Sequence, residues 1–216
     1  MLRLNRTSVT AWIAVVAVIA GLSYVLIGTA VRPASAQPNA PAAAQSNRSF
    51  NGFDLVDKTG NIRKPADFRD LYQILGTFVV LDPKVTMTGE PGKGHEMHMT
   101  YASPGTAAYY RKNGKFADGT VLVKEVLGTD QAQLTTGDAH WASEIQQWFV
   151  MIKDDKKRYP DNPLWGDGWG WALFKSDAPD KQVSTNYQQD CIGCHIPAKA
   201  TDWIYIQGYP VLTAKK

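Results

Sequence analysis

A five-residue segment near the C-terminal end, Cys191-Ile192-Gly193-Cys194-His195, sets the strongest limit on the architecture of this 216-residue chain. It contains both cysteines of the protein. On a helix, residues at positions i, i+3 and i+4 share one face, so two sulfurs and an imidazole converge on one point. This spacing is the attachment sequence of a c-type haem. The sequence therefore predicts one haem c, bonded to Cys191 and Cys194, with His195 as the iron ligand.

Three other interpretations of the two cysteines make different demands on the chain. A thioredoxin-like site needs the pair at the start of a helix in a βαβ unit, which this sequence does not supply. A structural zinc site needs four ligands, and no second pair lies nearby in sequence. A simple disulfide between Cys191 and Cys194 is compatible with an oxidising compartment. Pro197 predicts that the helix ends soon after His195, so the motif occupies a last helical turn.

The first 36 residues have the organisation of an export signal. Arg3 and Arg6 precede a mostly apolar run over residues 11–31, and Ala34-Ser35-Ala36 matches a signal-peptidase site. The run is also long enough to span a membrane. We expect residues 1–36 to be a cleaved signal peptide or, alternatively, an N-terminal membrane anchor. In both cases the rest of the chain is exported, and we expect a periplasmic protein.

The charge balance excludes one class of partner. Residues 1–36 hold three of the 23 basic residues and none of the 20 acidic ones, so the exported part is electrically neutral. A neutral chain without a basic cluster has no electrostatic drive toward nucleic acid, and we predict no nucleic-acid binding. Residues 37–49 are rich in Ala, Pro, Gln and Ser and predict a flexible linker. The haem domain is expected to occupy residues 50–216.

The hydrophobic pattern of this domain predicts a mainly β (α+β) fold, with an antiparallel β-sheet, peripheral helices and the C-terminal CxxCH helix carrying the haem. There is no GxGxxG motif and no long alternation of strands and helices, so a parallel sheet is not expected. A helix is predicted over 67–75, and a second from an N-cap at Ser103 to Gly114. A polar loop is predicted over 153–168. Strands are predicted over residues 77–81, 96–102, 120–127, 148–152 and 169–174.

Lys124 is the unusual residue of the most regular predicted strand. Alternation places Leu122, Lys124 and Val126 on one face and Glu125 on the other, among apolar neighbours. Each face thus carries one charge that needs a partner. Lys124 either extends to solvent at a sheet edge or faces a bound group. Aromatic residues that form plain core or a wall of the haem slot follow later in the chain: Trp165, Trp169, Trp171 and Phe174.

The segment His95-Glu96-Met97-His98-Met99 is not a zinc-protease motif, because its histidines are three residues apart instead of four. On a strand, His95, Met97 and Met99 face one way and Glu96 and His98 the other. The segment is either a mixed core strand, or His98 lines a haem pocket, or a methionine is the sixth iron ligand. The available thioethers are those of Met87, Met97, Met99 and Met151.

From about residue 65 to 212 the chain resembles the cytochrome P-460 family, which also includes the β-sheet cytochromes c′. Besides the CxxCH motif, the resemblance rests on several short segments. They are Gly76-Thr77-Phe78-Val79-Val80, Tyr101 with Pro104, Gly114 followed by Asp118-Gly119-Thr120-Val121-Leu122-Val123-Lys124-Glu125, and Thr201-Asp202-Trp203-Ile204-Tyr205 continuing into Tyr209-Pro210-Val211-Leu212.

This resemblance implies a homodimer with a five-coordinate haem. In the P-460 members, a lysine at the position of Lys124 is bonded to the porphyrin edge, and these enzymes oxidise hydroxylamine toward nitric or nitrous oxide. The resemblance implies Lys124, His98 and Asp190 as catalytic residues, with His98 standing where a P-460 enzyme has an arginine and Asp190 as the candidate distal acid. A small cytochrome would accept the electrons.

Two alternative functions are compatible with the same sequence. The c′ members of the family lack the lysine bond and bind nitric oxide. An electron-transfer cytochrome would instead use His195 and a methionine as the two axial ligands, which closes the iron to small molecules.

Overall fold

The computed structural model describes residues 50–82, 84 and 94–213. The expected signal peptide or anchor, the expected linker and Met87 lie outside these residues. Within the described ranges, no helix has the length and apolar character needed to cross a membrane.

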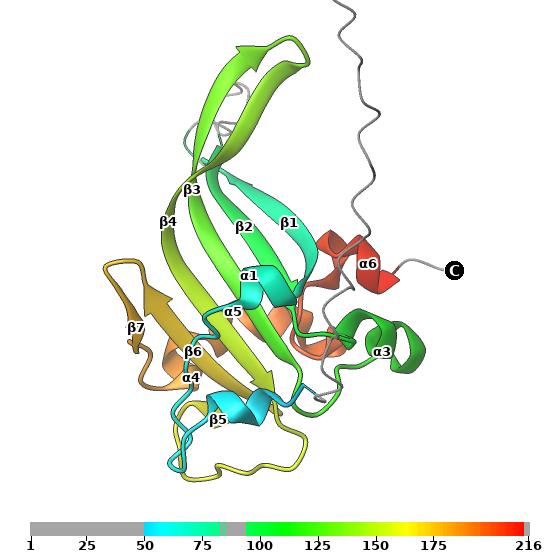
Figure 1. Ribbon diagram of the computed structural model, residues 1–216, viewed down its shortest axis with the longest axis vertical. Helices are drawn as coiled ribbons and strands as arrows, with labels where there is room; N and C mark the ends of the chain where they lie inside the picture. Colours follow the sequence, from blue (N-terminus) through cyan, green and yellow to red (C-terminus); the bar gives the residue numbers. More distant parts are fainter. Residues whose placement is uncertain (1–49, 83, 85–93, 214–216) are drawn as a thin grey trace, which may run out of the picture. The chain divides into compact units, whose positions relative to one another are not determined.

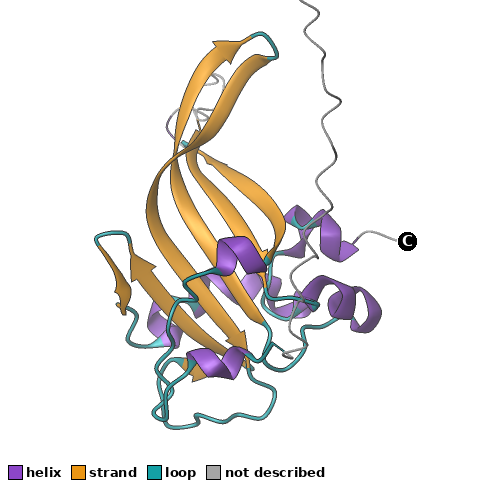
Figure 2. Ribbon diagram, in the orientation of Figure 1, coloured by secondary structure: helices purple, strands orange, loops and turns teal. Residues whose placement is uncertain are grey.

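An antiparallel β-sheet forms the body of the described domain, as predicted (Figure 2). Its order is β1-β2-β3-β4-β6-β5, with β7 paired to β6. The strands are β1 (Gln73–Leu81), β2 (Gly94–Ala102), β3 (Val121–Leu134), β4 (Gly137–Lys153), β5 (Trp165–Gly166), β6 (Trp169–Lys175) and β7 (Ala178–Gln182).

Short helices flank the sheet, and those of the C-terminal part follow one another along one of its faces (Figure 1). Pro197 acts as predicted, since α5 ends at His195 and the chain continues as a 3-10 helix. The helical elements are η1 (Gly52–Leu55), α1 (Phe68–Leu71), α3 (Thr106–Asn113), α4 (Tyr187–Asp190), α5 (Ile192–His195), η2 (Ile196–Thr201), η3 (Ile206–Gly208) and α6 (Pro210–Thr213).

Both predicted helices differ from the structure: the first is shorter than expected, and the second starts later. The helix expected over 67–75 is the single turn of α1, because the backbone from Gln73 onward pairs with β2 instead. The helix expected to be capped by Ser103 starts at Thr106. Ser103 Oγ instead accepts the N–H of Val121 at 3.0 Å, so this side chain serves the sheet.

The predicted strands were also too short. The strands expected over 120–127 and 148–152 are the inner halves of β3 and β4, which continue as a hairpin arm over residues 128–147 (Figure 1). The arm is rich in polar residues and lacks apolar alternation, so its sequence resembles a loop. The segment expected as the loop 153–168 contains the short strand β5.

The two faces of the sheet carry separate cores. On one face, Val123 and Val150 pack with Phe68 and Trp148, and Glu125 is buried there with Arg69 and the indole N–H of Trp148 as partners. On the other face, the C-terminal segment covers the sheet, and its Trp203, Ile204 and Tyr209 share a core with Trp171 of β6. Lys124 projects toward this second face, which also holds the cavity described next.

Candidate functional site

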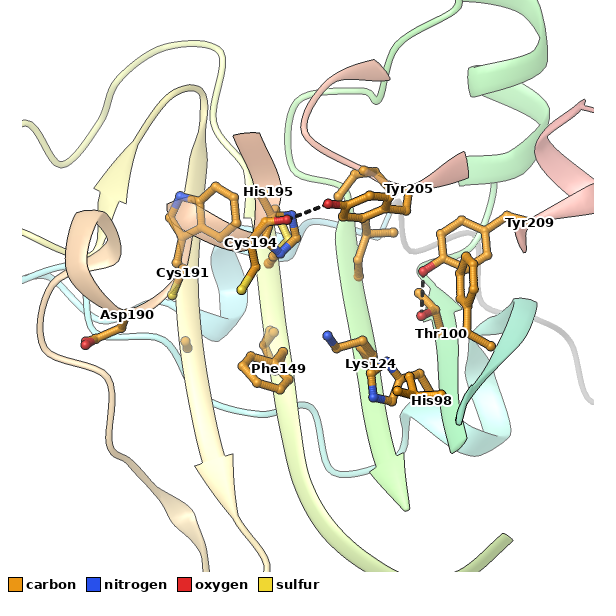
Figure 3. A pocket seen from close by; sticks show the side chains of 18 residues that line it. His98, Thr100, Lys124, Phe149, Asp190, Cys191, Cys194, His195, Tyr205 and Tyr209 are labelled. Atoms are coloured by element: carbon orange, nitrogen blue, oxygen red, sulfur yellow. Dashed lines mark hydrogen bonds between the residues drawn. The ribbon is translucent and has the colours of Figure 1, made fainter. Parts of the chain in front are cut away.

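A cavity of about 470 Å³ lies between the sheet and the C-terminal helices. His98 of β2, Lys124 of β3 and Phe149 of β4 line it from the sheet, while Cys191, Cys194 and His195 line it from α4 and α5 (Figure 3). Figure 3 shows both sulfurs and the Lys124 amine directed into the same space. The fold thus brings together residues that are distant in sequence.

The CxxCH residues are presented by two consecutive short helices. Asn186 caps α4, since its side-chain oxygen accepts the N–H of Gln188 at 2.9 Å. Cys191 then links α4 to α5, and both cysteines are free thiols. Burial raises the pKa of the Cys191 thiol to about 11, so this sulfur is protonated at neutral pH.

His195 is oriented by a backbone carbonyl. Its Nδ1 lies 2.6 Å from the Trp203 carbonyl oxygen and donates to it, because a carbonyl can only accept. The Nε2 atom is therefore the ring nitrogen with a free lone pair. Burial lowers the pKa of His195, which keeps the imidazole neutral and able to bind a metal.

The site residues fit a haem c. Two thiols and a neutral imidazole border one cavity with mostly apolar walls, as a covalently attached macrocycle with one histidine ligand requires. Trp171 stands edge-on to His195, with 4.9 Å between the ring centroids. Of the aromatic residues expected at the slot, only Trp171 borders the cavity, whereas Trp165 and Phe174 pack on the opposite face of the sheet and Trp169 lies in the core beside Phe116.

Lys124 lies in the middle of the sheet, so the interpretation that it extends to solvent at a sheet edge is wrong. It pairs with Thr100 on one side and Phe149 on the other. Its Nζ is 4.3 Å from the centroid of the Phe149 ring. Burial lowers the pKa of Lys124, and no carboxylate in the described part of the chain forms an ion pair with it. Both features favour the neutral, nucleophilic amine.

His98 borders the cavity and carries a carboxylate partner. Its Nε2 is 3.0 Å from Glu96 Oε2, so the two side chains share a face, as strand alternation predicts. Burial lowers the pKa of His98, and Glu96 opposes this shift. Met99 packs in the opposite core, and among the described methionines only Met151 borders the cavity. A His/Met ligand pair from these residues would have to use Met151.

Asp190 stands at the rim of the cavity but is engaged elsewhere. Its Oδ2 accepts the N–H of Thr185 at 2.7 Å and of Asn186 at 3.0 Å, and these bonds lower its pKa. Figure 3 shows the carboxylate pointing away from the cavity. Its observed contacts brace the start of α4, and its role as a distal acid stays a prediction.

Other cavity residues were not predicted from the sequence. Phe149 faces the cavity because it alternates in step with Met151 on β4, a signal already present in the strand predicted over 148–152. Tyr209 bonds Thr100 through its hydroxyl at 2.8 Å, and the Tyr205 hydroxyl donates to the Cys194 carbonyl at 2.7 Å. No local pattern marks these tyrosines, since their partners lie on separate elements.

An antiparallel sheet with a CxxCH helix over an apolar cavity defines the class of β-sheet c-type haem proteins. A family model described as Cytochrome P460 matches residues 65–206, more than half of the chain. The protein belongs to the cytochrome P460 family. No match was found among curated proteins.

Proposed function

We propose that this protein oxidises hydroxylamine toward nitric or nitrous oxide in the periplasm. The supporting observation is a single cavity with His195 on one wall and two basic side chains, Lys124 and His98, on the opposite wall. Cys191, Cys194 and His195 would hold the haem, which supplies the redox chemistry and an open coordination position.

His98 would accept a proton from hydroxylamine as its N–H and O–H bonds are lost on oxidation. A general base must be neutral and within reach of the proton, and the half-buried His98 imidazole with its lowered pKa meets the first condition at neutral pH. Glu96 bonds His98 and is partly exposed, so it can pass the proton to solvent.

Lys124 would form a third covalent attachment, in which one Nζ–H and one C–H bond of the porphyrin edge are replaced by an N–C bond. The two hydrogens leave as protons, and the two electrons pass to an external two-electron oxidant such as a peroxide. A buried lysine without an ion-pair partner is costly as a cation, and bond formation removes that charge. The direction of the Lys124 amine toward the side of the cavity that carries Cys194 supports this proposal (Figure 3).

The apolar lining supports a second candidate function, the binding of nitric oxide without turnover. Phe78 and Phe149 border the same cavity, and such walls suit a small uncharged ligand. In this case Lys124 would remain a free amine, as in the c′ members of the family.

A small electron-accepting cytochrome and a second copy of this chain are the proposed macromolecular partners. Ile196, which directly follows α5, is 57% exposed, so the end of the haem-attachment helix offers an apolar surface to an electron acceptor. The homodimer rests on the family resemblance and is tested below.

Replacing Lys124 by leucine separates the two candidate functions. We expect the Lys124→Leu holoprotein to lose any red-shifted ferrous Soret band and its hydroxylamine oxidation, while haem remains attached in a denaturing gel stained for peroxidase activity. Lys64→Leu is a matched control, because Lys64 also lies over an aromatic ring, 4.7 Å from the centroid of Trp148, on the other face of the sheet.

Mass spectrometry of the wild-type protein tests the cross-link independently of activity. A tryptic digest should hold the Lys124 peptide together with the haem peptide, with a lower hydrogen count than the separate parts. Release of a free, unmodified Lys124 peptide would reject the cross-link and favour nitric oxide binding. Haem that is extracted by acidic butanone would reject the attachment to Cys191 and Cys194.

A further inference from the structure

The turn that supplies the carbonyl for His195 has an unusual backbone. Asp202 and Trp203 follow each other with positive φ values of 59° and 69°. A left-handed conformation is uncommon for residues other than glycine and is a clear outlier for a bulky side chain such as tryptophan. Strained residues of this kind persist only where their surroundings fix them, and they concentrate at functional sites.

Contacts to the body of the domain fix this turn at Asp202. Lys153 Nζ donates to Asp202 Oδ1 at 2.7 Å, and the N–H of Phe116 donates to Oδ2 at 3.3 Å. The indole N–H of Trp169 donates to the Asp202 backbone carbonyl at 3.1 Å. Asp202 is therefore held through both of its carboxylate oxygens and through its main chain.

Lys153 is well placed to anchor the turn. It is the last residue of β4, and its backbone exchanges hydrogen bonds with Thr120 and Gly119. Its side chain is only 7% exposed and lies 5.1 Å above the ring centroid of Trp169. Asp155 is a further, more exposed partner at 3.3 Å. A buried charge of this kind is retained only with good partners, and Asp202 is its shorter contact.

We propose that Lys153 and Asp202 are positioning residues for His195, because their ion pair holds the strained Asp202–Trp203 turn and so aims the Trp203 carbonyl at His195 Nδ1. A strong hydrogen bond at Nδ1 fixes the tautomer and ring orientation and makes Nε2 a stronger electron donor to a metal. The ion pair would thereby act on the iron from the end of the sheet without touching the haem.

The test uses the ferrous holoprotein and resonance Raman spectroscopy of the iron–histidine stretch. In Lys153→Met the turn loses its anchor, and we expect this band to move to lower frequency. Exchange of the His195 Nδ1 proton with solvent, followed by NMR, should become about tenfold faster, the effect of losing roughly 1.4 kcal/mol of hydrogen-bond stabilisation. Lys153→Arg, which can still pair with Asp202, should restore both signals.

Arg69→Met is the matched control, because it also removes the cation of a buried carboxylate, Glu125, but on the other face of the sheet. We expect its iron–histidine band to stay at the wild-type position. A folded Lys153→Met holoprotein with an unshifted band would overturn the proposal, as would a band that shifts equally in Arg69→Met. If Lys153→Met does not fold, Lys153→Gln, which keeps one donor for Asp202, should give a smaller shift in the same direction.

This inference requires His195 to be the iron ligand but does not depend on the substrate. A wild-type ferrous protein without an iron–histidine band would contradict a five-coordinate iron with His195 as its protein ligand, and with it this proposal. A wild-type protein with the band, but without hydroxylamine oxidation, would contradict only the proposed enzymatic function. The iron–histidine band of the Lys153 variants would then still test the role of Lys153.

Discussion

At the scale of single residues, the cavity contains basic groups whose neutral forms are favoured by burial. The pKa values of Lys124, His98 and His195 are all lowered, and burial is the largest cause in each case. Neutral nitrogen atoms can attack, accept protons or bind metal, whereas their cations cannot. The chemistry assigned to these residues therefore depends on the depth at which the sheet and helices hold them.

The pH dependence of turnover tests His98 and its partner. A base works only while it is neutral, so hydroxylamine oxidation should fall as the pH drops through the His98 pKa, which burial places below the ordinary value of 6.5. Glu96 raises that pKa, while Lys124 across the strand pair lowers it. Glu96→Gln removes the raising effect, so we expect the acid limb of the rate profile to move to lower pH.

Asp180→Asn provides the comparison for this variant, because it removes an exposed carboxylate of β7 that does not border the cavity. Its acid limb should coincide with the wild-type one. An acid limb in Glu96→Gln that stays in place or moves to higher pH would contradict the role of His98 as the titrating base.

Sequence patterns predicted single site residues well where one local rule was sufficient. The CxxCH spacing predicted that Cys191, Cys194 and His195 converge, and all three border one cavity; strand alternation placed His98 with Glu96. The neighbours of Lys124 could not be predicted, because its position in the sheet depends on the order of all strands. The contact of Lys153 with Asp202 was not predicted either, because it joins two elements that are distant in sequence.

At the scale of elements, propensity gave the kind of structure but not its limits. The predicted strands all exist, yet β1 begins within the expected helix, because pairing with β2 outweighs a helical pattern of only a few residues. The arm of β3 and β4 was not predicted, because hydrogen bonds between its strands stabilise it instead of apolar burial, and its sequence therefore lacks apolar alternation. Tertiary pairing thus decided the boundaries.

The contact between β1 and η3 gives a test at this scale. A methyl group on Gly76 would collide with the Gly208 carbonyl oxygen, and backbone atoms cannot rotate away. We expect Gly76→Ala to lower the free energy of unfolding by about 1–3 kcal/mol, measured with urea. It should also loosen Tyr209, which follows η3 and bonds Thr100 beside the cavity. Gly193→Ala is the control, because a methyl group there meets no atom within 4 Å.

At the scale of the whole described domain, the sheet separates two tasks. One face buries the Glu125 carboxylate with its partners in a closed core, and the other face opens into the cavity under the CxxCH helix. Adjacent residues of β3 thus serve stability and chemistry, since Lys124 and Glu125 point to opposite faces. A single slip in the register of β3 would exchange the two charges, so strand pairing protects the site.

The arm over residues 128–147 has few stabilising contacts with the rest of the described domain. Its outer half pairs only β3 with β4, and a two-stranded hairpin is marginally stable alone in water. Leu134 and Trp141 are 49% and 41% exposed on it. The arm contains three acidic residues, Asp130, Asp138 and Glu144, and no lysine or arginine, so two arms repel each other. We therefore expect the arm to contact the body of a second copy.

Shortening the arm tests this contact. Thr129 pairs with Ala142, so residues 130–141 can be replaced by an Asn-Gly turn that closes the remaining strands. By light scattering we expect the full-length holoprotein to be dimeric and the shortened one to be monomeric. The shortened protein should keep its wild-type spectrum and carbon monoxide binding, because the arm does not line the cavity. Leu134→Ala with Trp141→Ala should weaken the dimer without removing strand pairs. A shortened chain that remains dimeric would assign the interface to another surface.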